Sequence, residues 1–213
     1  NADKWDNLSE ARQQNDWIDT QKELTDLQAN FSATALSPAG RLSYRLYKYR
    51  CERLIDDFSW RHHRYLVSQA SGWQQEIPSF LMNIHRLESA ADAESYIARL
   101  QAVDALVDQV IEQMKRGEGA GVLAPRFVYT NALRDCRNVL KGAPFDNSPR
   151  GENPLWADAN AKIERLGIEG GAKQKLRAGV LRALLTSVRP AYLKFIALCE
   201  EQESRASTDD GAW

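Results

Sequence analysis

Residues 92–114 read DAESYIARLQAVDALVDQVIEQM, and this stretch decides the fold class. Its apolar residues recur at steps of three and four, the spacing that places side chains on one face of an α-helix. They are Tyr96, Leu100, Val103, Val107, Val110 and Met114. Asp92 is suited to cap the start of this helix, and Gly117-Glu118-Gly119 is suited to end it. The stretch therefore predicts one long helix with a buried apolar stripe.

Two other stripes have the same period. One consists of Tyr47, Cys51, Leu54 and Phe58. Its helix is expected to begin at Ser37-Pro38, a capping residue followed by a proline at the first helical position. The other consists of Leu176, Val180, Leu184, Val188, Tyr192, Phe195 and Cys199. Pro190 lies inside it and should kink or split the helix, because proline cannot donate a backbone hydrogen bond.

Weaker helical patterns cover residues 9–31, 125–141 and 154–166, and no strand-like alternation extends beyond a few residues. The sequence therefore predicts an all-α protein of about six to eight helices arranged in antiparallel hairpins, with no significant sheet. We expect residues 1–213 to form a single helical domain. Glycine and proline punctuate residues 142–151, which predicts a surface loop and a sub-domain break near 142–153.

The charge balance bears on the class of partner. The chain has 28 Lys and Arg against 29 Asp and Glu, a net charge of -1, which argues against nucleic acid. Residues 41–50, RLSYRLYKYR, do interleave bases with aromatic residues, as single-strand-binding surfaces do. An amphipathic helix whose arginines reach nearby acids explains them without such a partner. No apolar run approaches the roughly 18 residues that span a bilayer, so we expect no membrane span.

The residues that commonly carry chemistry are few and scattered. Cys51, Cys136 and Cys199 lie far apart and form no CxxC pair, so we expect free, partly buried thiols. His62 and His63 are adjacent and would point about 100° apart on a helix, and the zinc motif HExxH is absent. The residues therefore predict no catalytic group, and no metal or other cofactor, in this chain.

Residues 69–83, QASGWQQEIPSFLMN, lie between two helical segments and are expected to form a loop. The Gln, the nearby Gly, the Ile-Pro pair with its aromatic neighbour, and the following His85 resemble a motif of the bacterial domain-of-unknown-function 885 family. ADAESYIARL (91–100) resembles a helix start of that family, and GVLAPRF (121–127) resembles one of its turns. Further counterparts are GAPF (142–145), NPLW (153–156), RPAY (189–192) and DGAW (210–213), so the resemblance runs from about residue 40 to the end.

The resemblance implies a mainly helical, zinc-peptidase-like protein considerably longer than this chain, with its HExxH helix downstream. The chain is then expected to be an N-terminal, non-catalytic fragment, and zinc would belong to the downstream part. Family members carry export or lipoprotein signals, which implies the periplasm or cell envelope. The chain begins Asn1-Ala2-Asp3, without Met or such a signal, so the cytoplasm is the alternative.

The loop allows two interpretations. In the structural one, Gly72 and Pro78 shape a tight connection between packed helices. In the functional one, polar residues line a cleft that faces the catalytic part, and the candidates are Gln69, Gly72, Gln74, Gln75, Glu76 and His85. The leading hypothesis is a scaffold and substrate-cleft wall for a metal-dependent peptidase or hydrolase. Its partners would be the downstream region of the same parent chain and a peptide substrate, with self-association of the isolated fragment. The alternative is a stand-alone helical protein-interaction module.

Overall fold

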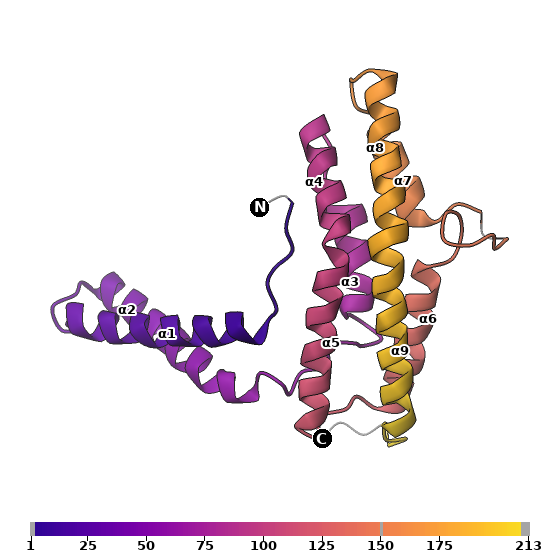
Figure 1. The fold of residues 1–213 in the computed structure, drawn as a ribbon. Coiled ribbons are helices and arrows are strands. Elements are labelled where there is room, and N and C mark those ends of the chain that lie inside the picture. Colours follow the sequence, from indigo (N-terminus) through magenta and orange to yellow (C-terminus); the bar gives the residue numbers. More distant parts are fainter. Residues whose placement is uncertain (1–2, 150, 210–213) are drawn as a thin grey trace. The chain divides into compact units, whose positions relative to one another are not determined.

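The computed structural model describes residues 3–149 and 151–209, which are almost entirely helical (Figure 1). The α-helices are α1 (Glu10–Asn30), α2 (Pro38–Asp57), α3 (Trp73–Ser79), α4 (Ala90–Gln101), α5 (Val103–Gly119), α6 (Arg126–Val139), α7 (Pro154–Glu164), α8 (Gly170–Ala183) and α9 (Arg189–Arg205). A 3-10 turn, η1 (Phe58–Trp60), follows α2, and the π-helical turns η2 (Phe80–Ile84) and η3 (Leu184–Val188) follow α3 and α8. The described residues contain no strand, only an isolated bridge between Ala143 and Glu152. The all-α prediction is confirmed, and this described part of the chain forms 7 helices when consecutive segments are counted together.

Contacts divide the described chain into two compact units, each of which is considered by itself. The hairpin unit comprises residues 7–64, and the bundle unit comprises the described residues of 1–6 and 65–213. The break predicted near 142–153 falls inside the bundle unit, in the loop between α6 and α7. Contacts do not show which segments fold independently, so the single domain and its break stay predictions.

The hairpin unit consists of α1 and α2, which run antiparallel. Arg61, just beyond α2, bonds Glu10 at the start of α1, while Tyr47 in the middle of α2 bonds Glu23 further along α1. The Ser37 side chain caps α2 and Pro38 occupies the first turn, as predicted. Of the second stripe only Cys51 is buried, whereas Tyr47 and Leu54 are exposed. The expectation of a buried stripe was wrong there, because one antiparallel neighbour covers only a narrow face of α2.

In the bundle unit, the stretch 92–114 forms two helices where one was predicted. Ala102 separates α4 from α5, although its N–H still donates to the oxygen of Ala98 and its oxygen accepts from the N–H of Leu106. All six residues of the stripe are buried. The start also differs, because Ser89 caps α4 by accepting from the backbone N–H of Asp92. The Asp92 carboxylate in turn accepts from the Ser89 hydroxyl at 2.8 Å, which makes a reciprocal capping pair.

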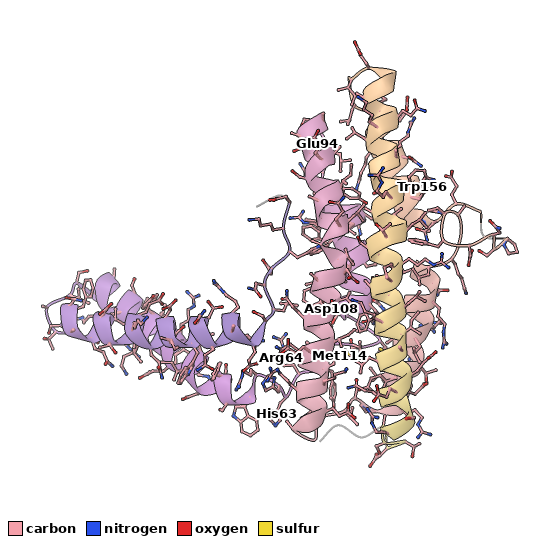
Figure 2. All side chains as sticks on the ribbon, viewed as in Figure 1. His63, Arg64, Glu94, Asp108, Met114 and Trp156 are labelled. Atoms are coloured by element: carbon pink, nitrogen blue, oxygen red, sulfur yellow. The ribbon has the colours of Figure 1, made fainter. Side chains whose placement is uncertain are left out.

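The α4–α5 and α8–α9 segments lie side by side and run parallel (Figure 1). Ile97 meets Gly179 near one end, and Gln202 donates to the backbone oxygen of Met114 near the other. Between them, Lys194 of α9 pairs with Asp104 at 2.8 Å and also with Asp108, which is labelled in Figure 2. Helices α6 and α7 return the chain from the end of α5 to the start of α8. Helix α6 therefore runs antiparallel to α9, against which it packs.

The third stripe is fully buried, and in place of the expected kink or split at Pro190, the segments α8, η3 and α9 follow one another without a gap. The chain passes from α8 through the wider turn η3 into α9, whose first turn contains Pro190. A π-helical turn tolerates the loss of one backbone donor better than a regular helix does. The helix therefore continues past the proline in nearly the same direction.

Candidate functional site

The stretch 69–83 is mainly helical, which corrects the prediction of a loop: it contains α3 and most of η2. Pro78 lies inside α3 and has no N–H to donate to the carbonyl of Gln74, four residues earlier. The Tyr192 hydroxyl of α9 donates to that carbonyl at 3.0 Å in a buried position. A residue far away in the sequence therefore supplies the hydrogen bond that Pro78 cannot make.

Gly72 fits where no larger residue would. A Cβ atom there would lie 2.3 Å from Oε1 of Gln74 and 2.9 Å from the backbone nitrogen of Ser68. The fully buried Gln74 donates through Nε2 to the backbone oxygen of Ser68 at 2.7 Å. This close packing agrees with the structural interpretation of the stretch, in which Gly72 shapes a tight connection.

Gln75 links α3 to α6. Its Nε2 donates to the Asp135 carboxylate at 2.6 Å in a partly buried position. Together with the hydrogen bond from Tyr192 to the Gln74 carbonyl, this contact connects α3 to both α6 and α9.

His85, directly after η2, belongs to a second polar cluster. Its Nδ1 lies 2.7 Å from Nη1 of Arg99, and both side chains are buried. The Arg99 guanidinium also donates twice to the backbone oxygen of Lys4, at 2.8 and 3.1 Å. It lies over the rings of Phe80 and Trp5, and the Trp5 indole N–H donates back to the Arg99 backbone oxygen at 2.8 Å. Arg99 thus holds the segment of Lys4 and Trp5 against α4.

The electrostatics favour a neutral His85. Burial, followed by the positive charge of Arg99, lowers the pKa of His85 below its ordinary value. Because Arg99 can only donate, Nδ1 accepts, and the ring proton sits on Nε2. The ring also packs edge-on against Tyr96 at 5.1 Å. This histidine is a structural acceptor whose lone pair is already used.

Lys162 of α7 completes this region. Its ammonium donates to the backbone oxygens of Leu81, Met82 and His85, at 3.1, 2.7 and 3.3 Å. These carbonyls end η2 and would otherwise lack partners, as carbonyls at helix C-termini do. Asp158 balances the charge of Lys162 at 2.8 Å.

The predicted cleft residues have separate surroundings. Gln69 and Glu76 are exposed, Gly72 is packed, Gln75 bonds to α6, and His85 bonds to α4. Gln74, considered with them, is fully buried. The role of these residues in a cleft stays a prediction.

Sequence reasoning missed Arg99, Lys162 and Asp135. Arg99 offered a signal, because it falls three residues after Tyr96 and four before Val103, on the buried stripe of the helix. A charged residue in such a stripe requires buried partners. Lys162 and Asp135 gave no comparable signal, since either could have lain on a solvated face.

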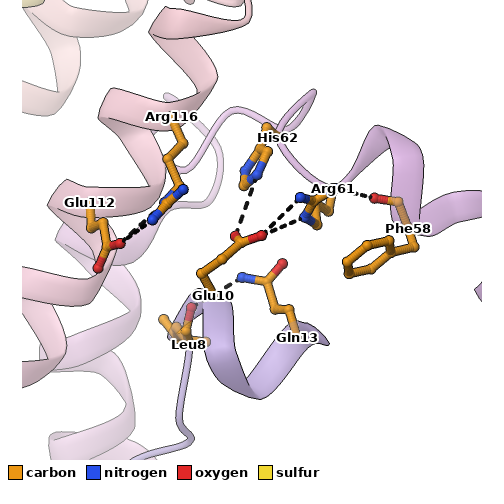
Figure 3. Close-up of polar contacts among 8 residues, drawn as sticks. All are labelled: Leu8, Glu10, Gln13, Phe58, Arg61, His62, Glu112 and Arg116. Atoms are coloured by element: carbon orange, nitrogen blue, oxygen red, sulfur yellow. Dashed lines mark hydrogen bonds and ion pairs between the residues drawn. The ribbon is translucent and has the colours of Figure 1, made fainter. Parts of the chain in front are cut away.

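The adjacent histidines lie in the hairpin unit, and Figure 3 shows the contacts of His62. Glu10 accepts from Arg61 at 2.8 and 3.0 Å, and Nε2 of His62 lies 3.4 Å from the same carboxylate. His63 packs edge-on against Trp60 at 4.8 Å. Within residues 3–149 and 151–209, no three His, Cys, Asp or Glu side chains are grouped to hold a metal ion, so the described residues do not fit a zinc site.

The cysteines are free and buried, which confirms the prediction of unpaired thiols. Burial raises the pKa of Cys199 to about 12 and raises that of Cys136 further. The thiolate is the nucleophilic form, so these thiols are poorly reactive near neutral pH.

A groove of about 380 Å³ lies between α1 and α2. Its lining includes the carboxylates Asp16 and Glu23 and, at its base, Cys51. Asp16 pairs with Arg12 at 2.8 Å, and Glu23 accepts from the Tyr47 hydroxyl at 2.7 Å. These two acids are thus engaged within the hairpin unit.

Comparisons with known proteins place this fold in context. A family model described as bacterial protein of unknown function (DUF885) matches residues 1–212. No relative is found among curated proteins. A crystal structure described as that of the "putative lipoprotein from Colwellia psychrerythraea" is similar, with a TM-score of 0.76 and 18% sequence identity. The match covers 94% of this chain and 35% of that protein, so this chain spans about a third of its length. None of the helices in the described residues is long and apolar enough to cross a membrane.

Proposed function

Since the chain belongs to the DUF885 family of bacterial proteins of unknown function, we propose that it is the non-catalytic N-terminal helical region of a metal-dependent peptidase or hydrolase. Its bundle unit would serve as a scaffold and as one wall of a substrate cleft. The base and the metal ligands would come from the downstream region of the parent chain. The match to about a third of a longer structural relative supports this division of labour.

The engagement of the polar groups in the bundle unit carries the proposal. His85 accepts from Arg99, Gln75 donates to Asp135, and Lys162 caps the carbonyls that end η2. A general base needs a lone pair within reach of substrate, and a nucleophile needs an activating neighbour. These side chains hold helices in place, which suits a scaffold.

The parent protein would then lie in the cell envelope. The description of the structural relative as a "putative lipoprotein" agrees with that compartment. Fractionation of cells that express the tagged parent gene tests this: recovery in the cytosolic fraction alone would contradict it.

The functional test compares the parent protein with this chain. Both are purified and assayed on a fluorescent casein substrate, with and without a zinc chelator. We expect the parent protein to cleave and the chelator to stop it, while this chain alone cleaves nothing. Chelator-sensitive cleavage by this chain alone would overturn the proposal.

A stand-alone interaction module is the second candidate, because α2 exposes Leu42, Leu46 and Tyr49. The parent reading frame separates the two. An HExxH motif downstream favours the peptidase scaffold, and a stop codon directly after Trp213 favours the module.

A further inference from the structure

The outer face of α2 has an apolar ridge. Leu42, Leu46 and Tyr49 are 56%, 60% and 63% exposed, and their spacing of four and three residues places them on one helical face. Cys51, which is buried toward α1, lies on the opposite side of the helix. Single exposed apolar residues are ordinary on a surface, but a contiguous ridge marks an interaction site.

Arginines border this ridge. Arg45 lies one turn from both Leu42 and Tyr49, and Arg53 lies one turn beyond Tyr49, where it pairs with Asp57 at 2.8 Å. From Pro38 to Cys51, α2 contains four bases and no acid. A partner that complements this face presents apolar side chains flanked by carboxylates.

The hairpin unit has little core of its own. Among its described apolar residues only Cys51 is buried, while buried apolar residues occur throughout α4 to α9. Two helices with so little shared burial gain most of their stability from further packing. A partner that packs over the ridge would supply this further packing.

We propose that the ridge of Leu42, Leu46 and Tyr49, with Arg45 beside it, docks onto the downstream region of the parent chain, at an apolar helix face bordered by Asp and Glu. This inference rests on the proposed function. The length of the structural relative, of which this match covers 35%, shows that a protein of this fold can have ample further chain to provide the cover.

Two other occupants fit less well. A symmetric pair of these ridges would set the arginines of one copy against those of the other, which costs free energy. An anionic bilayer would meet the acid Asp56 at the end of the same helix, where Arg53 already pairs with Asp57, and like charges repel. A protein face with carboxylates placed only beside the arginines avoids both conflicts.

The test measures the rate at which a thiol introduced by Leu46→Cys reacts with a maleimide dye. The three native thiols are buried, so the background is low. Asn15→Cys, at an exposed position of α1, is the matched control. Each substitution is made in this chain and in the full parent protein, and circular dichroism checks that each variant folds. Hydrogen exchange of peptides from residues 38–53 in the unsubstituted proteins gives the same comparison without a mutation.

In the parent protein we expect the Leu46→Cys thiol to react at least about tenfold more slowly than in this chain. The reaction rate of the Asn15→Cys thiol should be the same in both proteins. Adding Arg45→Glu should restore much of the lost rate, because it removes charge complementarity. Equal rates for Leu46→Cys in the two proteins would overturn the docking inference, while the casein assay still decides the proposed function. If the Leu46→Cys thiol of this chain reacts more slowly as the concentration of the chain rises, the ridge binds a second copy. If phosphatidylglycerol vesicles slow that reaction, the ridge binds a membrane. Either result overturns the inference.

Discussion

At the scale of single residues, distant side chains complete local structure. Pro78 reads as a helix breaker, yet α3 includes it because Tyr192 donates to the carbonyl that Pro78 leaves without a backbone donor. This carbonyl belongs to Gln74, which lies 118 residues before Tyr192 in the sequence, so no local pattern could have predicted the helix. The same holds for Lys162, which ends η2 from α7.

Removing the Tyr192 hydroxyl tests this compensation. Tyr192→Phe leaves a buried carbonyl without its donor and should lower the free energy of unfolding by roughly 1–3 kcal/mol. In a Pro78→Ala background the new backbone N–H can donate to the Gln74 carbonyl, so the same substitution should cost less. Urea denaturation of the four proteins of this cycle measures the difference. An equal cost in both backgrounds would show that Pro78 is unrelated to the bond.

Gly72 gives a second residue-scale prediction. A methyl group there meets Gln74 and the backbone of Ser68, so Gly72→Ala should destabilise the fold by roughly 1–3 kcal/mol. Gly119→Ala is the control, because a Cβ at the end of α5 meets nothing within 4 Å. The control should be neutral or stabilise by about 0.4–1 kcal/mol. If both variants have the same urea midpoint, Gly72 is not closely packed.

His85 predicts how stability depends on pH. Its folded-state pKa lies below the ordinary value of 6.5, so the unfolded chain binds the proton first as pH falls. The contribution of His85 to stability is therefore complete above pH 6.5 and is lost as pH falls from there toward the lowered pKa. His85→Gln removes the titrating ring, so the free energy of unfolding should change less with pH between about pH 7 and about pH 5. His63→Gln retains His85 and should retain its pH dependence; loss of that dependence in this control would contradict the assignment.

At the scale of helices, the periodicity of apolar residues predicted most of the helices. It did not predict whether a neighbouring helix covers an apolar stripe, and therefore whether that stripe is buried. The stripes of 92–114 and 176–199 are buried throughout, and the weaker patterns at 9–31, 125–141 and 154–166 correspond to α1, α6 and α7. The break at Ala102 was not predictable, because alanine is the best helix former and leaves no local signal. The stripe of α2 has the same period as the others but lies mostly exposed, since its spacing says nothing about what covers it.

Leu100 tests the coverage of the first stripe. Leu100 is fully buried in α4, so Leu100→Ala should cost roughly 2–5 kcal/mol of stability, as truncation of a buried leucine does. Leu46→Ala is the matched control, because the same truncation at a 60% exposed site of α2 should cost less than about 0.5 kcal/mol. Thermal and urea unfolding measure both. A cost below about 0.5 kcal/mol at Leu100 would mean that its face is exposed in solution.

At the scale of the whole chain, the sequence predicted an all-helical protein but not its division into two units. The hairpin and bundle units have similar helical patterns, and their difference lies in burial, which depends on contacts between distant segments. The candidate site shows the same limit. The sequence singled out the stretch 69–83 and His85 but not the residues that bond to them. Asp135 bonds to Gln75, Tyr192 to Gln74 and Arg99 to His85, and these three partners come from three other helices.

The difference in burial predicts unequal stability along the chain. Local opening is easiest where few apolar groups are buried, and the hairpin unit buries only Cys51 among its described apolar residues. In hydrogen exchange, amides of α1 and α2 should therefore exchange about tenfold or more faster than those of α5 and α9, at a pH where all the helices are formed. Mass spectrometry of peptides from the four helices measures this directly. Frayed helix ends are excluded by comparing central peptides only. Equal protection in α2 and α9 would mean that the hairpin unit opens only when the bundle unit unfolds, and burial within each unit would then fail as a guide to its stability.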